Sequence, residues 1–428
     1  MNKFFQIKEN DTTVKRELLA GAVSFFTIVY IVVVNASILS DAGIPLEAGI
    51  IATIFSSVAG CLIMGFLGNA PIILVPGMGV NALFTYTICQ SMGLGWKEGL
   101  AAVAVSGLLF TVIAFSRLTD ILSKAIPSSI KEAITVGIGI FLTFIGLQKG
   151  KLVVSSDTTF VKMGNLSDPH VIVTIITLLV TVILFARGVK GEFLISILFG
   201  SMLAASFGLI DPSASKGSGS PFSDYFHVFG ALSFHSLLQF GFWAAVFSLT
   251  MVIVFENVGL VHGHVGMINR PDKFKKALQA NALSAFLSGV AGTSPTVSTV
   301  ESAAGIASGG RTGLTAITTG LFFLLSLFFL PFVKLVPDSA IAPILILIGG
   351  LMIQSIQKID LQDFTESFPA FLIIALIPLT YSIVDGMAFG FIAYPILKMA
   401  MKRGKEVTLP LYVIAFLFLV NFLFQSLH

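Results

Sequence analysis

Two glutamates stand inside stretches of sequence that are otherwise apolar, and their type and position suit them for chemistry. Glu256 lies in the run Phe255-Glu-Asn-Val-Gly259, and Glu301 follows an interruption in another apolar run. A carboxylate accepts hydrogen bonds, and burial favours its protonated form, so each side chain can bind N–H groups and exchange a proton. The structural alternative is a protonated glutamate that only joins two helices.

Two interrupted segments accompany the glutamates. The first is Pro76-Gly-Met-Gly-Val-Asn81, and the second places Pro295 among Thr, Ser and Val residues shortly before Glu301. Proline removes a helix donor and glycine loosens the backbone, so we expect neither segment to form one continuous helix. The alternative for each is an ordinary kink. Asn81 is a third candidate polar group, although asparagine also commonly joins helices to one another.

The composition places these residues in a membrane. Only 11% of the 428 residues are charged, whereas soluble proteins average about 25%. Hydrophobic residues make up 55% of the chain and occur in runs of about 20, the length that crosses a bilayer. We therefore expect an all-α polytopic membrane protein, which excludes soluble enzymes and nucleic-acid-binding proteins. An intramembrane enzyme is not expected, because the sequence has no HExxH motif and no evident membrane-buried aspartate pair or Ser/His pair.

A polar stretch near the midpoint divides the apolar runs into two sets of seven. Residues 18–210 hold the first set and residues 237–400 the second, with a loop at residues 211–236 between them. An odd number of spans reverses the orientation of the second set, which predicts two inverted seven-span repeats and about 14 transmembrane segments. Residues 401–428 hold a basic loop and an apolar segment, Leu409–Leu427, which is either a further span or a helix lying on the membrane.

The basic residues orient this topology. With residues 1–17 as a cytoplasmic N-terminal segment, 19 of the 25 Lys and Arg residues fall on the cytoplasmic side and 6 fall outside. This bias follows the positive-inside rule for short loops. We therefore expect a multi-pass protein of the cell membrane, with a cytoplasmic N-terminus and an extracellular loop between the repeats.

The interrupted segments occupy matching places, because they fall in the third span of each set, Pro71–Cys89 and Pro295–Ser308. Transporters built from repeats place paired discontinuous helices around a central site. Half-helix ends offer N–H donors and the glutamates offer acceptors, so we expect a neutral, planar ligand that carries both kinds of group. We expect no metal or cofactor. His262 and His264, at the end of the eighth span, are expected to be solvated at the membrane interface.

With these residues in view, the chain resembles the nucleobase/ascorbate transporter superfamily (nucleobase-cation symporter-2), and within it the AzgA-like branch of purine permeases. The resemblance covers nearly the whole chain. It is carried by the stretch from Pro76 to Phe84, by the stretch from Gly292 to Gly313, and by Pro378-Leu-Thr-Tyr-Ser-Ile383.

The resemblance implies a core domain and a gate domain, with short strands where the third and tenth spans are broken. It implies import of hypoxanthine, guanine or adenine coupled to protons. Glu256 and Glu301 would accept hydrogen bonds from purine N–H groups, and one of them would carry the proton. Asn81 would support the site, and the backbone around Val80 and Val300 would supply further hydrogen bonds.

The eighth span departs from the pattern of this branch. The branch commonly has two aspartates three residues apart, whereas this chain has Ile253 and Glu256, followed by Asn257. Glu256 with Gly259 is closer to the uracil and xanthine branches. Uracil, xanthine or a small anion therefore stays an alternative cargo, and Na⁺ an alternative coupling ion to H⁺. The expected partners are the substrate and the lipid bilayer; a homodimer is left open and nucleic acid is not expected.

Overall fold

The computed structural model describes residues 4–119, 126–210 and 221–426. Within these residues, nine helices are long and apolar enough to cross a membrane by length and composition. Three shorter apolar helices, α9, α17 and α19, accompany them. The structure is therefore that of an all-α polytopic membrane protein, as the composition predicts.

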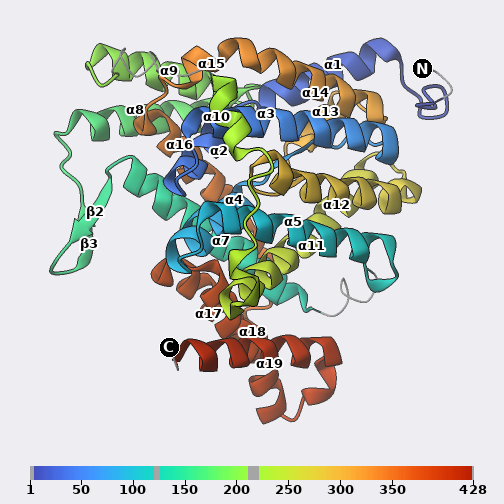
Figure 1. Ribbon diagram of the computed structural model, residues 1–428, viewed down its shortest axis with the longest axis vertical. Helices are drawn as coiled ribbons and strands as arrows, with labels where there is room; N and C mark the ends of the chain where they lie inside the picture. Colours follow the sequence, from blue (N-terminus) through green and yellow to red (C-terminus); the bar gives the residue numbers. More distant parts are fainter. Residues whose placement is uncertain (1–3, 120–125, 211–220, 427–428) are drawn as a thin grey trace.

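The first half of the chain begins with a long span in two parts and ends in a pair of helices after a β-hairpin (Figure 1). Its elements are α1 (Val14–Ile28), α2 (Ile31–Asp41), α3 (Leu46–Ile63), η1 (Met64–Gly68), β1 (Leu74–Pro76), α4 (Met78–Ala82), η2 (Leu83–Ser91), α5 (Trp96–Phe115), α7 (Ser128–Lys149), β2 (Val153–Ser156), β3 (Phe160–Met163), α8 (Pro169–Ala186) and α9 (Glu192–Ser206).

The second half repeats the combination of long helices with one broken segment. Its elements are α10 (Pro221–Val228), η4 (His235–Leu238), α11 (Phe240–Met267), η5 (Pro271–Lys273), α12 (Phe274–Ala291), β4 (Thr296–Ser298), α13 (Ser302–Ala307), α14 (Gly313–Leu325), η6 (Ser326–Phe329), α15 (Leu330–Val333), α16 (Asp338–Met352), η7 (Ile353–Lys358), α17 (Phe364–Thr380), α18 (Ile383–Ala400), η8 (Gly404–Glu406) and α19 (Leu409–Ser426).

Polar residues cap the starts of several apolar helices. The Thr13 hydroxyl accepts a hydrogen bond from the backbone of Arg16 at the start of α1, and Asp363 does the same for Thr365 at the start of α17. Asp168 caps α8 by accepting from the N–H of His170, and this bond lowers the pKa of Asp168 because it stabilises the charged carboxylate. These caps satisfy helix donors that would otherwise lack partners.

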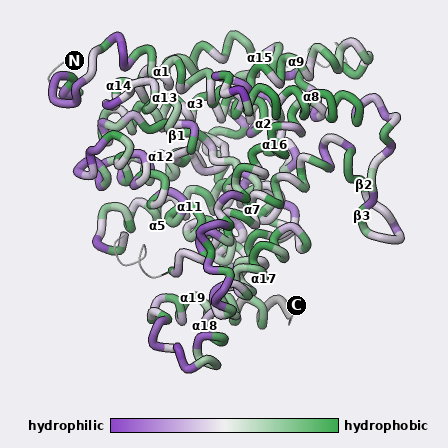
Figure 2. The backbone as a smooth tube through the Cα atoms, turned by 180° about the vertical axis from the view of Figure 1, so that it is seen from behind, coloured by the Kyte–Doolittle hydropathy of each residue, from purple (hydrophilic) through white to green (hydrophobic). Residues whose placement is uncertain are grey.

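The helices pack in two groups. In one group α1 contacts α14, α3 contacts α2 and α14, and α12 contacts α5 and α3. In the other group α7 contacts α16 and α17, and α8 contacts α16 and α9. Figure 1 shows α1 and α14 at one end of the long axis and α19 at the other. Figure 2 shows hydrophilic residues in the N-terminal segment and in the connection to α19, whereas the outer helices are largely apolar.

Small residues bring α7 and α16 close together. A Cβ atom on Gly139 would lie 2.8 Å from the carbonyl oxygen of Gly349, and one on Gly146 would lie 2.9 Å from the carbonyl oxygen of Ala342. Glycine therefore lets the two backbones approach, as small residues do between membrane helices.

The two broken segments meet in a two-stranded antiparallel sheet. Leu74 of β1 lies opposite Ser298 of β4, and Pro76 lies opposite Thr296. The N–H of Gly77 also donates to the carbonyl oxygen of Pro295, over 3.3 Å. The expectation of short strands in the third and tenth spans is confirmed at this point, because the backbone freed by the breaks in the two halves is paired across the sheet.

Two connections differ in detail from a plain series of helices and loops. The first span contains a short break, since α1 ends at Ile28 and α2 begins at Ile31. The polar stretch at residues 211–236 is not all loop, because residues 221–228 form α10; residues 211–220 lie outside the described part of the chain. A β-hairpin made of β2 and β3 also projects from the body between α7 and α8 (Figure 1).

Glu17 is an acid that the sequence places at the end of a span, yet its side chain is fully buried. Its carboxylate accepts hydrogen bonds from the backbone of Arg311 (2.9 Å) and Thr312 (3.2 Å), and from the hydroxyls of Thr312 (2.9 Å) and Thr315 (2.6 Å). These donors surround the start of α14, where a negative charge is favoured by the helix dipole. Glu17 thus fastens α1 to α14.

Candidate functional site

A cavity of about 620 Å³ lies between the two broken segments, α11 and α7. The two glutamates singled out from the sequence both line it. Residues of α1, α2, α4, α9, α16 and η7 complete the wall. The polar and charged residues that line the cavity are Tyr30, Ser128, Lys131, Glu132, Thr135, Glu256, Ser298, Thr299, Glu301, Ser355 and Lys358.

Glu301 is the N-cap residue of α13, directly after β4 and the break. The hydroxyl of Tyr30 donates a hydrogen bond of 2.6 Å to its Oε1 atom. Tyr30 is itself held by edge-to-face packing on Phe193, with ring centroids 4.7 Å apart. The second carboxylate oxygen of Glu301 has no hydrogen-bond partner among the described residues, so it can accept a bond from a ligand.

Glu256 lies on α11 and faces the same cavity. Within the described part of the chain its carboxyl group makes no hydrogen bond or ion pair. A carboxyl group at membrane depth without a protein partner is costly, which is why such residues usually serve a ligand or ion path. Glu256 therefore offers an acceptor, or in its protonated form a donor, to whatever enters the cavity.

Asn257, the neighbour of Glu256, fixes β4 to α11. Its Oδ1 atom accepts from the N–H of Ser298 at 2.8 Å and from Nδ2 of Asn281 at 2.5 Å, while its own Nδ2 donates to the carbonyl oxygen of Ile253 at 2.7 Å. His264, seven residues further along α11, has Nδ1 3.1 Å from the Ser298 hydroxyl. Two side chains on one face of α11 therefore clamp the strand that leads to Glu301.

The expectation of a solvated His264 is wrong, because only 4% of this residue is exposed. The fold also brings this histidine beside a buried serine that is distant in sequence, since Nδ1 of His264 lies 3.1 Å from the Ser298 hydroxyl. His262, in contrast, is exposed and packs its ring against Phe274. Sequence alone could not separate two histidines that sit two residues apart near a span end.

The remaining candidate residues are placed differently from one another. Val300 lines the cavity and is 65% exposed, whereas Asn81 and Val80 are fully buried. Their neighbours Met78 and Gly79 line the cavity instead. Neither Oδ1 nor Nδ2 of Asn81 has a hydrogen-bond partner among the described residues. The structure therefore brings Glu256, Glu301 and Val300 to one space and sets Asn81 one layer behind it.

One end of the cavity is lined by charged residues that the sequence assigns to loops. Lys358 of η7 forms an ion pair of 3.4 Å with Glu132, near the start of α7. The Nζ atom of Lys131 lies 5.8 Å from the centroid of the Phe255 ring on α11, within the range of a cation–π contact. The contact between Lys131 and Phe255 joins α7 to α11 across the cavity.

Comparisons with known proteins identify the fold and family. The model of a family described as "Permease family" matches residues 15–389. The chain belongs to this permease family. The nucleobase transporter PlAzg2 of Paenibacillus larvae is 53% identical over 381 residues, which are 89% of this chain and 76% of that protein. The guanine/hypoxanthine permease PbuO of Bacillus subtilis is 38% identical, over 97% of this chain and 99% of that protein.

A further relative of this permease is the adenine permease AdeP of Escherichia coli, which is 32% identical over 100% of this chain and 97% of its own. The resemblance to the purine branch of the nucleobase/ascorbate transporters is therefore confirmed, and the permease is not an enzyme. Among solved structures, the transmembrane domain of a cyanobacterial bicarbonate transporter, BicA, has a TM-score of 0.68 at 14% identity. The superposition covers 87% of this chain and 97% of the BicA chain, so the two proteins share a fold.

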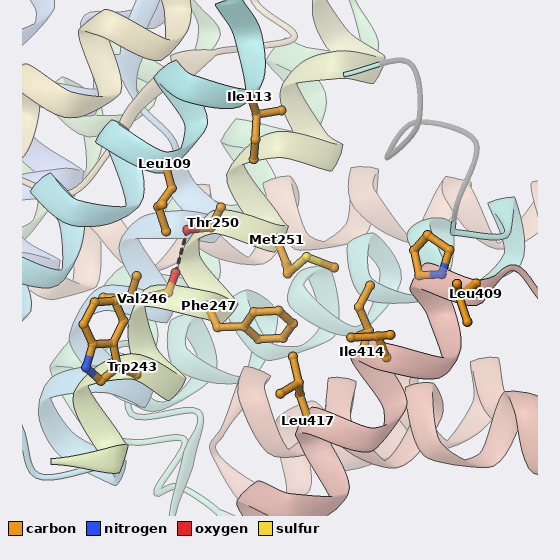
Figure 3. A pocket seen from close by; sticks show the side chains of 12 residues that line it. Leu109, Ile113, Trp243, Val246, Phe247, Thr250, Met251, Leu409, Ile414 and Leu417 are labelled. Carbon is orange, nitrogen blue, oxygen red and sulfur yellow. Dashed lines mark hydrogen bonds between the residues drawn. The ribbon is translucent and has the colours of Figure 1, made fainter. Parts of the chain in front are cut away.

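The permease has a second, apolar cavity of about 530 Å³ between α5, α11 and α19 (Figure 3). The hydroxyl of Thr250 on its wall is already bonded to the carbonyl oxygen of Val246, over 2.7 Å. The lining of this cavity is otherwise almost entirely apolar, so it offers a nucleobase or an ion few hydrogen-bond partners. Met251 lines both cavities.

Sequence reasoning missed Tyr30 and Lys131. Tyr30 stands in a long apolar run, where a single tyrosine carries no signal, and the interruption at its position contains neither proline nor glycine. Lys131 lies near the end of a span, where basic residues normally orient the chain. As for metals, the described residues contain no group of three His, Cys, Asp or Glu side chains that could hold an ion.

Proposed function

We propose that this permease is a secondary active transporter that imports a purine nucleobase, namely hypoxanthine, guanine or adenine, across the cytoplasmic membrane together with protons. The observation that carries the proposal is that Glu256 and Glu301 line one cavity and each keeps an acceptor oxygen without a protein partner. Purine bases are planar and present N–H groups, so two carboxyl groups complement them. The relatives named as guanine/hypoxanthine and adenine permeases support the choice of a purine, and the relative named as a nucleobase transporter agrees with it.

In this proposal each site residue has a distinct role. Glu301, oriented by Tyr30, accepts a hydrogen bond from the base, and Glu256 accepts a second one. One of the two carries the coupled proton, because a buried carboxyl group exchanges protons more readily near neutral pH than a solvated one. The backbone at Val300 and Val80 contributes further hydrogen bonds to the base. Asn81 is buried behind the cavity wall and supports the third span there.

The proposal also covers how the helices divide into a fixed and a moving part. The chain forms two inverted seven-span repeats, with residues 18–210 in the first, residues 237–400 in the second and an extracellular loop between them. The group around α1, α3 and α12 carries the site as the core, and the group around α7 and α16 moves against it as the gate. The N-terminus lies in the cytoplasm.

The test is uptake of labelled hypoxanthine, guanine and adenine by cells that express the permease. Glu301→Gln and Glu256→Gln should each reduce uptake severely while the protein still reaches the membrane. Glu9→Gln, an exposed change in the N-terminal segment, is the matched control and should leave uptake unchanged. Full uptake by Glu301→Gln would overturn the proposal.

Coupling is tested by removing one gradient at a time. Collapse of the proton gradient should stop accumulation of the base, and removal of Na⁺ should not. Accumulation that follows Na⁺ and ignores the proton gradient would reject proton coupling while leaving purine transport intact.

A second candidate keeps the fold and changes the cargo to a small anion. It is favoured by Lys131 and Lys358, which line the cavity, and by the shared fold with a bicarbonate transporter. The two cargoes are separated by thermal stabilisation of the purified protein, because a ligand raises the melting temperature of the state that it binds. Stabilisation by bicarbonate and not by hypoxanthine would favour the anion; uracil and xanthine belong in the same panel.

A further inference from the structure

The cavity between the glutamates follows only one half of α7 and one half of α16. Within the described part of the chain, it is lined by α7 between residues 128 and 138 and by α16 and η7 between residues 348 and 358. The other halves, residues 139–149 and 338–347, pack closely against each other and do not line it. The cavity therefore meets the surface near the exposed Lys358 and is closed at the opposite end.

Lys149, the last residue of α7, is the centre of a group of charged hydrogen bonds at the closed end. Its Nζ atom lies 2.9 Å from Oδ2 of Asp41, 3.2 Å from the hydroxyl oxygen of Ser37 and 3.4 Å from Oδ1 of Asp338. An ammonium group has three N–H donors, so these three acceptors match it. The Ser37 hydroxyl donates in turn to Oδ1 of Asp338, over 3.2 Å. These four residues form the Lys149 cluster.

The Lys149 cluster joins the two helix groups. Ser37 and Asp41 stand on α2, which packs against α3, whereas Lys149 and Asp338 belong to α7 and α16. The contacts of Lys149 with Asp41 and Ser37, and the bond from Ser37 to Asp338, each run from one group to the other. The groups can therefore separate at this end only if these contacts break.

We propose that the Lys149 cluster is a latch that closes the far end of the cavity, and that the substrate reaches the site from that end only after Lys149 has left Asp41 and Ser37. The inference rests on the proposed function, since a secondary transporter must open its site to each side in turn. In the orientation proposed above, the latch faces the outside and the end at Lys358 faces the cytoplasm.

The charges of the cluster suit a latch that holds and can still open. The Lys149 ammonium lies between two carboxylates, Asp41 on one group and Asp338 on the other, and attracts both. Without the ammonium the two carboxylates would repel each other and push α2 away from α16. Only 11% of the Lys149 side chain is exposed, whereas 54% of the Asp338 side chain is. Water can therefore replace the bonds as they break, which keeps the cost of opening moderate.

The test is the access of a membrane-impermeant thiol reagent to a single cysteine in the cavity. Thr135→Cys places a thiol of similar size on the α7 wall, in full-length protein whose Cys61 and Cys89 are replaced by alanine. From outside intact cells the reagent should act slowly, and Lys149→Met should speed the reaction about tenfold, because loss of hydrogen bonds to charged groups raises the population of the open state. In inside-out vesicles the same thiol should react readily.

A second variant and a matched control complete the test. Asp41→Asn weakens the latch from the other group and should also speed the reaction from outside, and the double variant should be no faster than the faster single variant, because both changes break one contact. Lys151→Met is the control: it removes a positive charge at the same end, but its ion pair of 3.6 Å joins Lys151 to Asp168, at the start of α8 on the same side as α7.

The outcomes separate the latch from the proposed function, because the thiol reaction needs no substrate. Reaction rates of Lys149→Met and Asp41→Asn that equal the rate of Lys151→Met would overturn the latch and leave purine transport intact. If the wild type takes up none of hypoxanthine, guanine and adenine, the proposed function fails. Faster labelling of both latch variants would then still support the latch, as the gate of a transporter with another cargo.

Discussion

The hydroxyl of Tyr30 donates a hydrogen bond of 2.6 Å to Oε1 of Glu301, although 271 positions separate the two residues. Tyr30 stands where α1 gives way to α2, and Glu301 stands where β4 gives way to α13. Two interruptions of regular helix therefore meet in one bond. Tyr30 therefore holds Oε1 of Glu301, and the other carboxylate oxygen of Glu301 stays open to the cavity.

Loss of this bond should weaken substrate binding. Tyr30→Phe removes the donor and keeps the ring that packs on Phe193, so the fold should be unchanged. Because a hydrogen bond to a charged group contributes about 1.5 to 3 kcal/mol, we expect affinity for the base to fall roughly tenfold or more. Tyr86→Phe is the control, since Tyr86 bonds to Asp41 at 2.7 Å outside the cavity. Equal affinities of Tyr30→Phe and wild type would contradict the prediction.

Removal of the Asn257 side chain should destabilise the protein. Asn257→Ala leaves the N–H of Ser298 and the amide of Asn281 without their acceptor in a fully buried place. Each buried unpaired group costs about 1 to 3 kcal/mol, so a loss of roughly 2 to 4 kcal/mol is expected in the free energy of unfolding. Asn257→Asp keeps an acceptor oxygen for both donors and, when protonated, can still donate to the carbonyl oxygen of Ile253, so it should lose less. The measurement is thermal unfolding in detergent, and equal melting curves for both variants would argue against the role of the acceptor.

Glu17→Gln should also destabilise the permease, by roughly 2 to 3 kcal/mol. The carboxylate accepts from four donors, and an amide group would turn its own N–H₂ toward some of them. Glu9→Gln serves as the control because Glu9 is exposed. Thermal unfolding of the two variants compares them directly. A melting temperature of Glu17→Gln within error of the control would show that these bonds contribute nothing measurable.

Acid should loosen the cluster that joins α17, α18 and η8. The Thr365 hydroxyl and the Arg403 guanidinium hold the pKa of Asp363 at about 2, and Arg403 with Lys398 does the same for the pKa of Glu406. Unfolded chains have values near 4, so this stabilisation is present above about pH 4 and is lost as the pH falls toward about 2. The difference in melting temperature between wild type and Arg403→Met should therefore shrink between pH 5 and pH 3, and a constant difference would disprove the link.

How far the sequence predicts the site depends on whether a residue disturbs its local pattern. Glu256 and Glu301 are visible because a charge in an apolar run is rare and costly, and the broken spans are visible because Pro76 and Pro295 cannot continue a helix. Tyr30 disturbs nothing, since tyrosine is compatible with an apolar helix, and its role appears only once Glu301 is beside it.

The error on His264 has the same origin, and the burial of Glu17 is hidden from the sequence in the same way. Both residues lie near the ends of spans, where polar residues usually meet water, and the sequence offers no sign that a distant segment covers them. In the fold, the start of α14 covers Glu17 and β4 covers His264. Burial of this kind is decided by contacts between segments that are far apart in sequence, so local patterns cannot reveal it.

The sheet between β1 and β4 also sets an order for biosynthesis. The two strands are more than 200 residues apart, so the ribosome makes β1 and several later helices before β4 exists. Until then the strand-forming groups of β1 have no partner, and bare backbone groups are not tolerated in lipid. The newly made first half must therefore be shielded, by the insertion machinery or by water, until the second half arrives. The cavity between the glutamates is therefore not closed until most of the second half of the chain has been made.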